Sequence, residues 1–71
     1  MTPDGAVLWR LRSPKREHAH ASVLPGGPPF TLAFFVDHQL DRVENYDTLD
    51  LALARADHIR SILVQDGWHD V

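Results

Sequence analysis

The sequence contains no cysteine among its 71 residues. This absence excludes disulfide bonds, thiolate zinc sites, cysteine nucleophiles and the CxxC pairs of redox proteins. A domain of this size buries only about 60% of the surface that its unfolded chain exposes, so a lone monomer should have little stability. The remaining means of support are good packing, a metal site built from histidine and aspartate, or association with another chain.

Long hydrophobic runs are also missing. No apolar run of signal-peptide length follows the N-terminus, and no stretch reaches the about 18 residues that a membrane-spanning helix needs. We therefore expect a cytoplasmic protein with no membrane partner. Hydrophobic residues make up 44% of the chain and charged residues 24%, which is typical of a single small globular domain. That domain should span residues 1–71, with residues 1–5 and 69–71 frayed.

An excess of positive charge is absent, because seven Lys and Arg oppose ten Asp and Glu. A formal charge of -3 argues against a general polyanion binder, so nucleic acid is not the expected partner. The charge is nevertheless uneven: residues 1–20 carry +2, residues 21–36 carry none and residues 37–71 carry -5. Such polarity can steer association with a charged partner, or it can be solvated surface on opposite edges of a domain.

Apolar residues alternate in the N-terminal third, which predicts two strands. Residues 6–12 have a period of two, with Val7, Trp9 and Leu11 on one face. A polar loop that contains a proline follows, and residues 18–24 alternate in the same way. The two segments should pair as a hairpin.

The middle of the chain predicts two more strands. Residues 25–29, with the sequence PGGPP, form the strongest breaker and should be a loop. Residues 30–36 are apolar on both faces, which favours a place inside the sheet and leaves Phe35 in need of cover from outside the main core. A short turn at residues 37–39 leads into residues 40–46, whose charges suit an edge strand.

The C-terminal third predicts one amphipathic helix. Asp47 and Thr48 are both competent N-caps, and about 18 residues without proline or glycine follow. Gly67 suits the position just after the helix, with Trp68 as the hydrophobic partner of that cap. The expected fold is α+β: an antiparallel four-stranded meander with one C-terminal helix packed on one face, in two layers.

At this level the chain resembles short uncharacterised bacterial proteins that have a strand-rich N-terminal part. The resemblance covers roughly residues 7–68 and is carried by the first apolar strand, the hairpin turned at residues 37–39, the Thr-capped alanine-rich helix and the closing Gly67-Trp68. It implies a bacterial protein and supplies no activity, ligand or catalytic residue. A weaker likeness, through residues 46–56, is to the sheet-plus-helix antitoxins of the HicB type, which can reflect shared supersecondary structure alone.

Several apolar residues are surplus to a core on one face of the sheet. Three are assigned to the face away from the helix and two to the helix outside its main stripe: Leu8, Leu24, Phe35, Leu51 and Ile62. A contiguous exposed patch of this kind marks an interface, whereas single surface apolars are normal. These residues predict a homodimer that forms through the uncovered sheet face or through an edge strand beside it, and a different protein partner is the other possibility.

One basic cluster offers an alternative function. It contains Arg10, Arg12, Lys15 and Arg16 beside an aromatic, Trp9. Nucleic-acid-binding sites combine cations, which contact phosphates, with aromatic rings, which stack on bases. This pattern keeps open a nucleic-acid-binding or antitoxin-like regulator that uses the hairpin at residues 10–16. Alternation places Trp9 opposite to both arginines, however, which suits a core residue and a solvated hairpin.

Metal binding has weak candidates. His18 and His20 project from one strand face, about 7 Å apart at Cα, and could share a metal if His69 or an aspartate approached as a third ligand. Two ligands are too few for a metal site. In addition, histidine pairs of this spacing are common at exposed positions on strands. We therefore expect no metal and no cofactor.

Catalysis is not expected either. Three adjacent pairs supply acid and base residue types: Asp37-His38, Asp57-His58 and His69-Asp70. Neighbours in sequence, however, rarely orient one another's catalytic groups. No motif of a hydrolase, metalloprotease or phosphate-binding loop surrounds them. The sequence thus predicts a protein-interaction module that is not an enzyme and acts as a homodimer.

Overall fold

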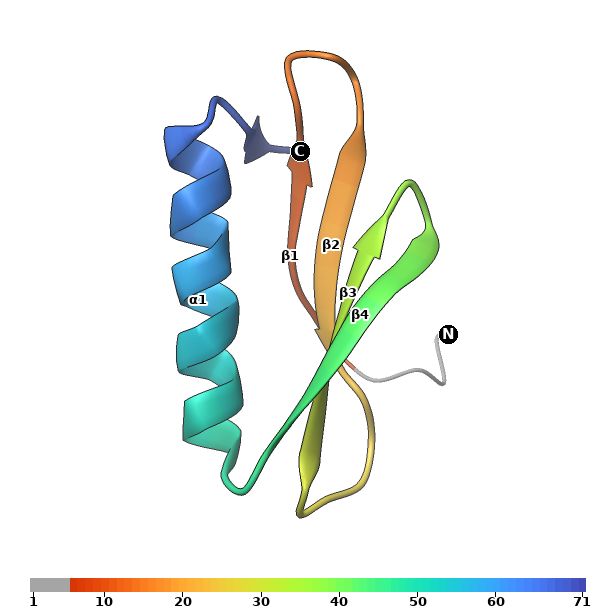
Figure 1. Ribbon diagram of the computed structural model, residues 1–71, viewed down its shortest axis with the longest axis vertical. Helices are drawn as coiled ribbons and strands as arrows, with labels where there is room; N and C mark the ends of the chain where they lie inside the picture. The colour runs from red at the N-terminus through yellow and green to blue at the C-terminus, as the bar shows by residue number, and fades with distance from the viewer. Residues whose placement is uncertain (1–5) are drawn as a thin grey trace.

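The structure, a computed structural model, describes residues 6–71 (Figure 1). Along the chain it has the elements β1 (Ala6–Arg12), β2 (His18–Val23), β3 (Phe30–Val36), β4 (Gln39–Tyr46), α1 (Leu49–Gln65) and β5 (His69–Asp70). The strands form one sheet in the order β4-β3-β2-β1-β5, and all neighbours are antiparallel. The expected α+β class, antiparallel sheet and C-terminal helix are confirmed, and β4 lies at the edge where its charges place it.

The sheet has five strands, so the predicted number of four is wrong. The chain turns back after α1, and β5 pairs with β1 through Leu11 opposite Asp70 and Arg12 opposite His69. The expectation that residues 69–71 fray is therefore wrong too, while the frayed N-terminus predicted for residues 1–5 lies outside the described residues. A two-residue strand has no hydrophobic alternation of its own, which is why the sequence pattern does not reveal it.

A bulge in β1 changes the faces predicted for its first residues. Val7 is opposite Ser22 and Trp9 is opposite Ala21, so Leu8 is an extra residue between two normal pairs. Val7 consequently shares the side of Ser22, not that of Trp9 and Leu11. Leu8 packs with Trp9 against the core cluster, and its assignment to the face away from the helix is wrong.

The turn between β3 and β4 is shorter than expected. Asp37 and His38 both have positive φ, 50° and 69°, and Gln39 already belongs to β4. Two positive φ values in a two-residue loop give the hairpin twist that flanking strands need, and aspartate and histidine tolerate this region better than most residues. The Asp37 carboxylate also accepts a hydrogen bond from the backbone N–H of His18, at 2.9 Å, which ties the turn to β2.

Both ends of α1 follow the sequence signals. The Thr48 hydroxyl accepts from the N–H of Leu51, and Asp50 lies in the first turn. At the C-terminus the N–H of Gly67 donates to Val64 and that of Trp68 donates to Leu63. Gly67 has φ +100°, the left-handed conformation that ends many helices and that costs glycine least. This cap reverses the chain and thereby delivers β5 to the edge of β1.

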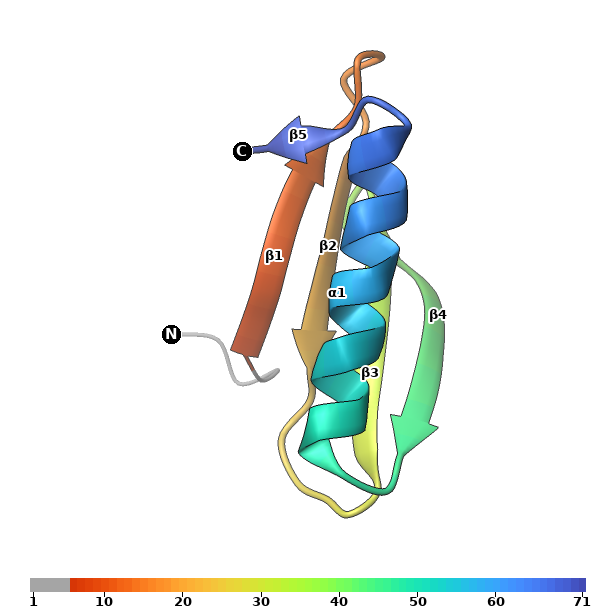
Figure 2. The same ribbon diagram turned by 90° about the vertical axis from the view of Figure 1, so that its left-hand side faces the viewer.

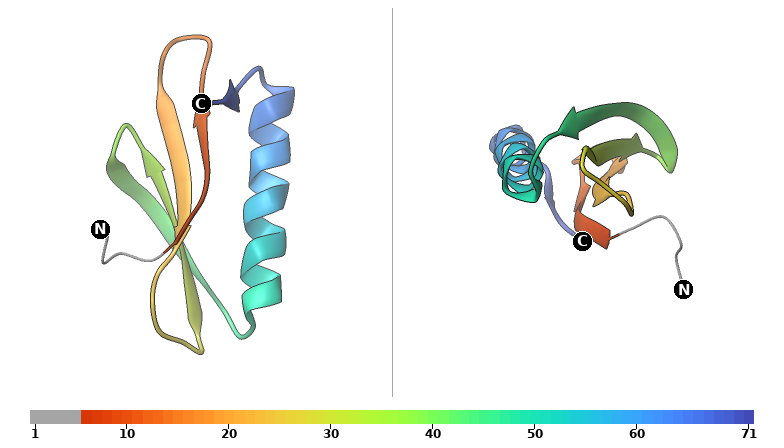
Figure 3. Two further views of the ribbon diagram at one scale, coloured as in Figure 1. Left: turned by 180° about the vertical axis from the view of Figure 1, so that it is seen from behind. Right: turned by 90° about the horizontal axis from the view of Figure 1, so that it is seen from below.

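Small residues on α1 allow its middle to approach the sheet closely (Figures 2 and 3). Ala52 and Ala56 are buried, and Ala56 belongs to one core cluster with Ala21, Leu32 and Phe34. The indole N–H of Trp9 donates to the backbone carbonyl of Ala56 at 3.0 Å, which fixes the helix to β1. Among the described residues, Leu11 and Leu32 are the largest side chains that are fully buried, so the core is thin.

The bond between Trp9 and Ala56 can be tested against the second tryptophan. Trp9→Phe removes the indole N–H that donates to Ala56. Trp68→Phe makes the same change at a half-buried ring whose N–H has no hydrogen-bond acceptor among residues 6–71. We expect Trp9→Phe to lower the free energy of unfolding by about 1 kcal/mol more than Trp68→Phe, the net value of one intramolecular hydrogen bond. Urea unfolding followed by circular dichroism measures both. Equal losses would mean that the Trp9 ring contributes only its area.

Candidate functional site

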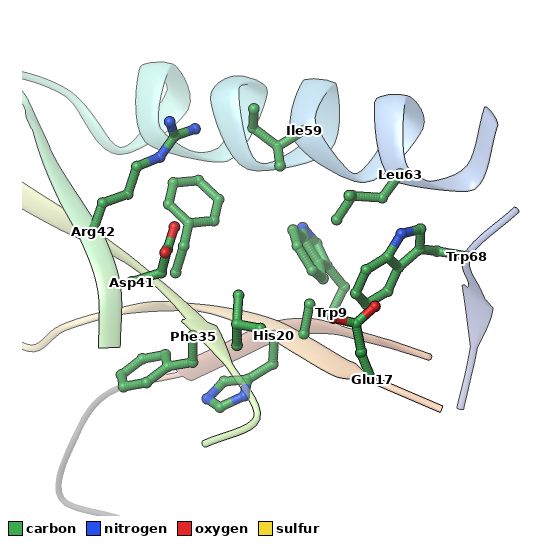
Figure 4. Close-up of a pocket in the computed structure, with 12 residues that line it drawn as sticks. Trp9, Glu17, His20, Phe35, Asp41, Arg42, Ile59, Leu63 and Trp68 are labelled. Atoms are coloured by element: carbon green, nitrogen blue, oxygen red, sulfur yellow. The ribbon is translucent and has the colours of Figure 1, made fainter. Parts of the chain in front are cut away.

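A cleft lies between the C-terminal half of α1 and the sheet (Figure 4). Its volume is about 180 Å³. Apolar side chains from the sheet, from the helix and from the segment after it make up most of its lining: Trp9, Ala19, Phe34, Val36, Ile59, Leu63 and Trp68. Both tryptophans, Ile59 and Leu63 are only half-buried, so the helix does not close over the aromatic side chains beneath it.

Charged residues of β4 form one border of this cleft. The guanidinium of Arg42 lies over the ring of Phe34, 5.2 Å from its centroid. Arg42 is opposite Phe34 and Leu40 is opposite Phe35, so Asp41 is a bulge residue between them. His20 and Phe35 also contribute to the lining, but Figure 4 shows their rings on the other side of the strands, pointing away from the helix.

Glu44 joins β4 to α1. Its carboxylate accepts from the Tyr46 hydroxyl at 2.5 Å and from Arg55 Nε at 3.1 Å, and it lies 3.6 Å from Arg42 Nε. The bond from Tyr46, followed by that from Arg55, lowers the pKa of Glu44, and the same carboxylate raises the pKa of Tyr46. This junction holds β4 near the N-terminal half of the helix. In Figure 1, β4 then diverges from α1 toward its own N-terminal end. Asp41 and Arg42, in this part of β4, line the cleft.

The outer side of β4 has no neighbouring strand among the described residues. Leu40 and Val43 are exposed on this strand, 58% and 48% respectively, on the side of the sheet that bears Phe35 and Ala33. On the helix, Leu51 and Ile62 lie within about 40° of Arg55, the residue that contacts β4, at 100° per residue. Exposed apolar side chains therefore lie on β4 itself and on the side of α1 that carries Arg55.

The predicted interface residues fall into three groups in the structure. Leu51 and Ile62 are exposed, 54% and 43%, as their positions outside the main helix stripe predict. Leu24 and Phe35 are half-buried, and Phe35 lies against His20 with 4.4 Å between the ring centroids and 6° between the ring planes. Leu8 belongs to the core instead, because of the β1 bulge. Of the predicted interface residues that stay accessible, Phe35 lies on β3 and Leu51 and Ile62 lie on the helix.

Basic residues gather at the other side of the same sheet face. Arg10 is paired across the strands with His20, and Arg12 with His18, so all four side chains lie on the side of Phe35. Lys15 and Arg16 follow in the exposed β1–β2 turn. The Ser13 hydroxyl accepts from the N–H groups of Lys15 and Glu17 and so orders this turn. The predicted split between Trp9 and the two arginines is confirmed.

The ion pairs of the described residues use only the C-terminal cations. Arg42 and Arg55 bind Glu44, and Arg60 binds Asp70 at 2.6 Å. None of the four cations of the sequence cluster is within 4.0 Å of a carboxylate oxygen of residues 6–71. The positive charge of this face is therefore not neutralised by the neighbouring part of the described structure.

Three histidines approach one another beside the basic residues. His38, from the β3–β4 turn, has its ring centroid 6.2 Å from that of His18 and 6.3 Å from that of His20. The third metal ligand considered from the sequence was His69, but His69 lies in β5 opposite Arg12. Within residues 6–71 no group of three or more potential ligands is arranged to hold a metal ion.

The other acid–base pairs do not assemble into a site. Asp57 and His58 are exposed on α1, and Asp70 of the C-terminal pair binds Arg60.

Within residues 6–71, no helix combines the length and the apolar character that crossing a membrane requires.

The sequence pattern reveals neither the cleft nor the position of His38 beside His18 and His20. The cleft results from the divergence of β4 and α1, which no local pattern encodes. One signal for the cleft was present in the sequence. The apolar residues of the helix occupy a wider arc than one sheet face can cover. His38 could have been found by folding the predicted 37–39 turn back over the 18–24 strand.

Comparison with known proteins finds no matching family model, curated protein or solved structure.

The environment of His20 predicts a loss of stability in acid. Burial, then the nearby Arg10 and His38, lower the pKa of His20. The native state thus binds this proton more weakly than the unfolded chain, so the stability that His20 contributes is complete above the unfolded pKa of about 6.5. It is lost as the pH falls through that value toward the folded pKa. Urea unfolding should show lower stability at about pH 5.5 than at about pH 7.5.

Two variants isolate the contribution of His20. His20→Phe keeps a ring against Phe35 but cannot take up a proton, so its loss of stability on acidification should be smaller than that of the wild type. His58→Gln, on the exposed face of α1, should behave like the wild type. If His20→Phe loses as much as the wild type, another group is responsible for the acid sensitivity.

Proposed function

We propose that this protein is an interaction module without enzymatic activity that acts as a homodimer, with the edge of β4 and the adjoining cleft as its contact surface. The observation that carries the proposal is the free edge of β4 with the exposed apolar residues Leu40 and Val43 on this strand. An unpaired edge strand presents a row of backbone donors and acceptors that another strand can satisfy. A second copy supplies such a strand without the need for any other partner.

The sequence of β4 is self-complementary about Val43. When two copies pair antiparallel with a two-fold axis at Val43, Arg42 of each chain lies opposite Glu44 of the other. Opposite charges across strands stabilise a pair, and like charges weaken it. The exposed Val43 side chains then meet at the axis on one side of the sheet. Two-fold symmetry allows this one surface to cover itself in both chains.

The cleft lies beside the same edge. Its border residue Arg42 belongs to β4, and its helix wall includes Ile59 and Leu63. A second chain along β4 brings its own side chains next to this apolar lining. Burying a large apolar side chain contributes roughly 1.5 to 3 kcal/mol, a substantial part of the few kcal/mol that a chain of this length holds by itself.

Replacement of Val43 by glutamate should produce monomers. The two carboxylates would face each other at the two-fold axis, while the exposed position leaves the fold of one chain intact. Light scattering at tens of micromolar should give twice the chain mass of 8.0 kDa for the wild type and one chain mass for Val43→Glu. Val7→Glu is the control, because Val7 lies on β1 away from the proposed contact and is exposed 38%. It should remain dimeric.

Arg42 provides a second, independent pair of variants. Arg42→Glu places two carboxylates opposite each other twice in the dimer, whereas Arg42→Gln only removes the charge. Both lose the contact with the ring of Phe34 and the ion pair with Glu44, and Arg42→Glu also adds a carboxylate beside Glu44 within one chain, so thermal unfolding must show that each variant is folded. We expect Arg42→Glu to be monomeric and Arg42→Gln to be dimeric. A wild type of one chain mass, or a dimeric Val43→Glu, would refute this mode of association.

A further inference from the structure

The face of β1 and β2 opposite to the helix combines positive charge with aromatic rings. Arg10 and Arg12 of β1 are cross-strand neighbours of His20 and His18 of β2. Phe35 continues the same row on β3, stacked on His20. We call this set, together with Lys15 and Arg16 in the β1–β2 turn and His38 in the β3–β4 turn, the basic face.

From this arrangement we propose that the basic face binds single-stranded nucleic acid. Four cations that have no carboxylate partner among residues 6–71 can each approach a phosphate. The formal charge of the whole chain is -3, but the acidic residues are concentrated in residues 37–71 and the cations in residues 10–16. Binding of a polyanion depends on such local clustering, because at physiological salt charges more than about 8 Å apart are largely screened.

The rings of the basic face favour unpaired bases over a duplex. Single strands expose the faces of their bases, which stack on Phe, Tyr, Trp or His rings and on the guanidinium planes of arginine. His18 and His20 are half-buried and His38 is exposed, so the three imidazoles are accessible in part. A duplex hides its base faces and would use only the cations.

This surface differs from the proposed dimer contact. The cations of the basic face lie on β1 and in the β1–β2 turn, and its rings extend to β3 and the β3–β4 turn, whereas the free edge is the outer side of β4 at the other end of the strand order from β5. Antiparallel pairing about an axis perpendicular to the sheet places the corresponding faces of both sheets on the same side. A dimer would then present two basic faces to one strand of nucleic acid, although each face is complete within one chain.

Fluorescence anisotropy with labelled twelve-nucleotide oligo(U), oligo(dT) and a duplex of the same length tests the proposal. The wild type should bind the single strands more tightly than the duplex. Four phosphate contacts should give a slope of roughly -3 in the plot of log affinity against log salt. No binding at about 50 mM salt, or a duplex bound as tightly as the single strands, would overturn the proposal.

Substitutions that remove the same charge at two places separate the basic face from a general charge effect. Arg10→Gln should weaken binding and reduce the salt slope by about 1, whereas Arg60→Gln should leave both unchanged because Arg60 binds Asp70 elsewhere. Arg10→Gln/Arg12→Gln/Lys15→Gln should reduce the slope by roughly 2 and keep the melting temperature, which shows that folding is not the cause. Equal effects of Arg10→Gln and Arg60→Gln would refute the assignment.

Val43→Glu distinguishes this inference from the proposed dimer. A monomeric Val43→Glu should keep the salt slope per chain, because the basic face is intact. Binding that disappears with the dimer while the cations are present would show that the single-chain site is wrong. A wild type that is monomeric but binds the single strand would refute only the dimer.

Discussion

The close contact between Ala56 and the sheet determines how the rest of the molecule is arranged. The small side chain lets α1 approach β1 until the indole N–H of Trp9 reaches the Ala56 carbonyl. Glu44 provides a second attachment through Arg55, the neighbouring residue on the helix. A straight helix held at its middle cannot follow a twisted sheet along its whole length. The sheet turns away from the C-terminal half of α1, and the aromatic cleft is the result.

The core is thin, so the distance between the helix and the sheet decides how much apolar surface is buried. With one helix and no disulfide, the chain has few ways to bury its larger apolar side chains. The buried positions next to the helix are mostly alanines, which permit close approach but contribute little area. Both tryptophans, Phe34 and several aliphatic residues thus meet in a space that is only partly filled. The same constraint that brings the helix close in the middle leaves apolar surface accessible at its end.

The local signals of the sequence predicted most of the elements, and the exceptions have specific physical reasons. Alternation located β1 and β3 with their observed bounds, and Thr48 and Gly67 marked the limits of α1. Alternation failed where the ladder is irregular: the bulge at Leu8 reversed the side of Val7 and turned Leu8 into the core. The basic face was only half visible, because its arginines are close in sequence while His38 and Phe35 join through long-range pairing.

The short strand β5 has a consequence for the kind of assembly that this sheet can form. It occupies the outer side of β1 at Leu11 and Arg12, and the N–H of Val71 also reaches the Arg10 carbonyl. The remaining part of β1 carries the bulge at Leu8, and a bulge twists an edge away from regular pairing. Within residues 6–71 the border at β1 is thus partly covered by β5, while β4 has no neighbouring strand on its outer side. β4 also carries a bulge, at Asp41, so the regular part of its free edge runs from Arg42 to Tyr46. In the proposed association along β4, a sheet that extends at this border alone would stop at a closed pair and would not continue into a fibre.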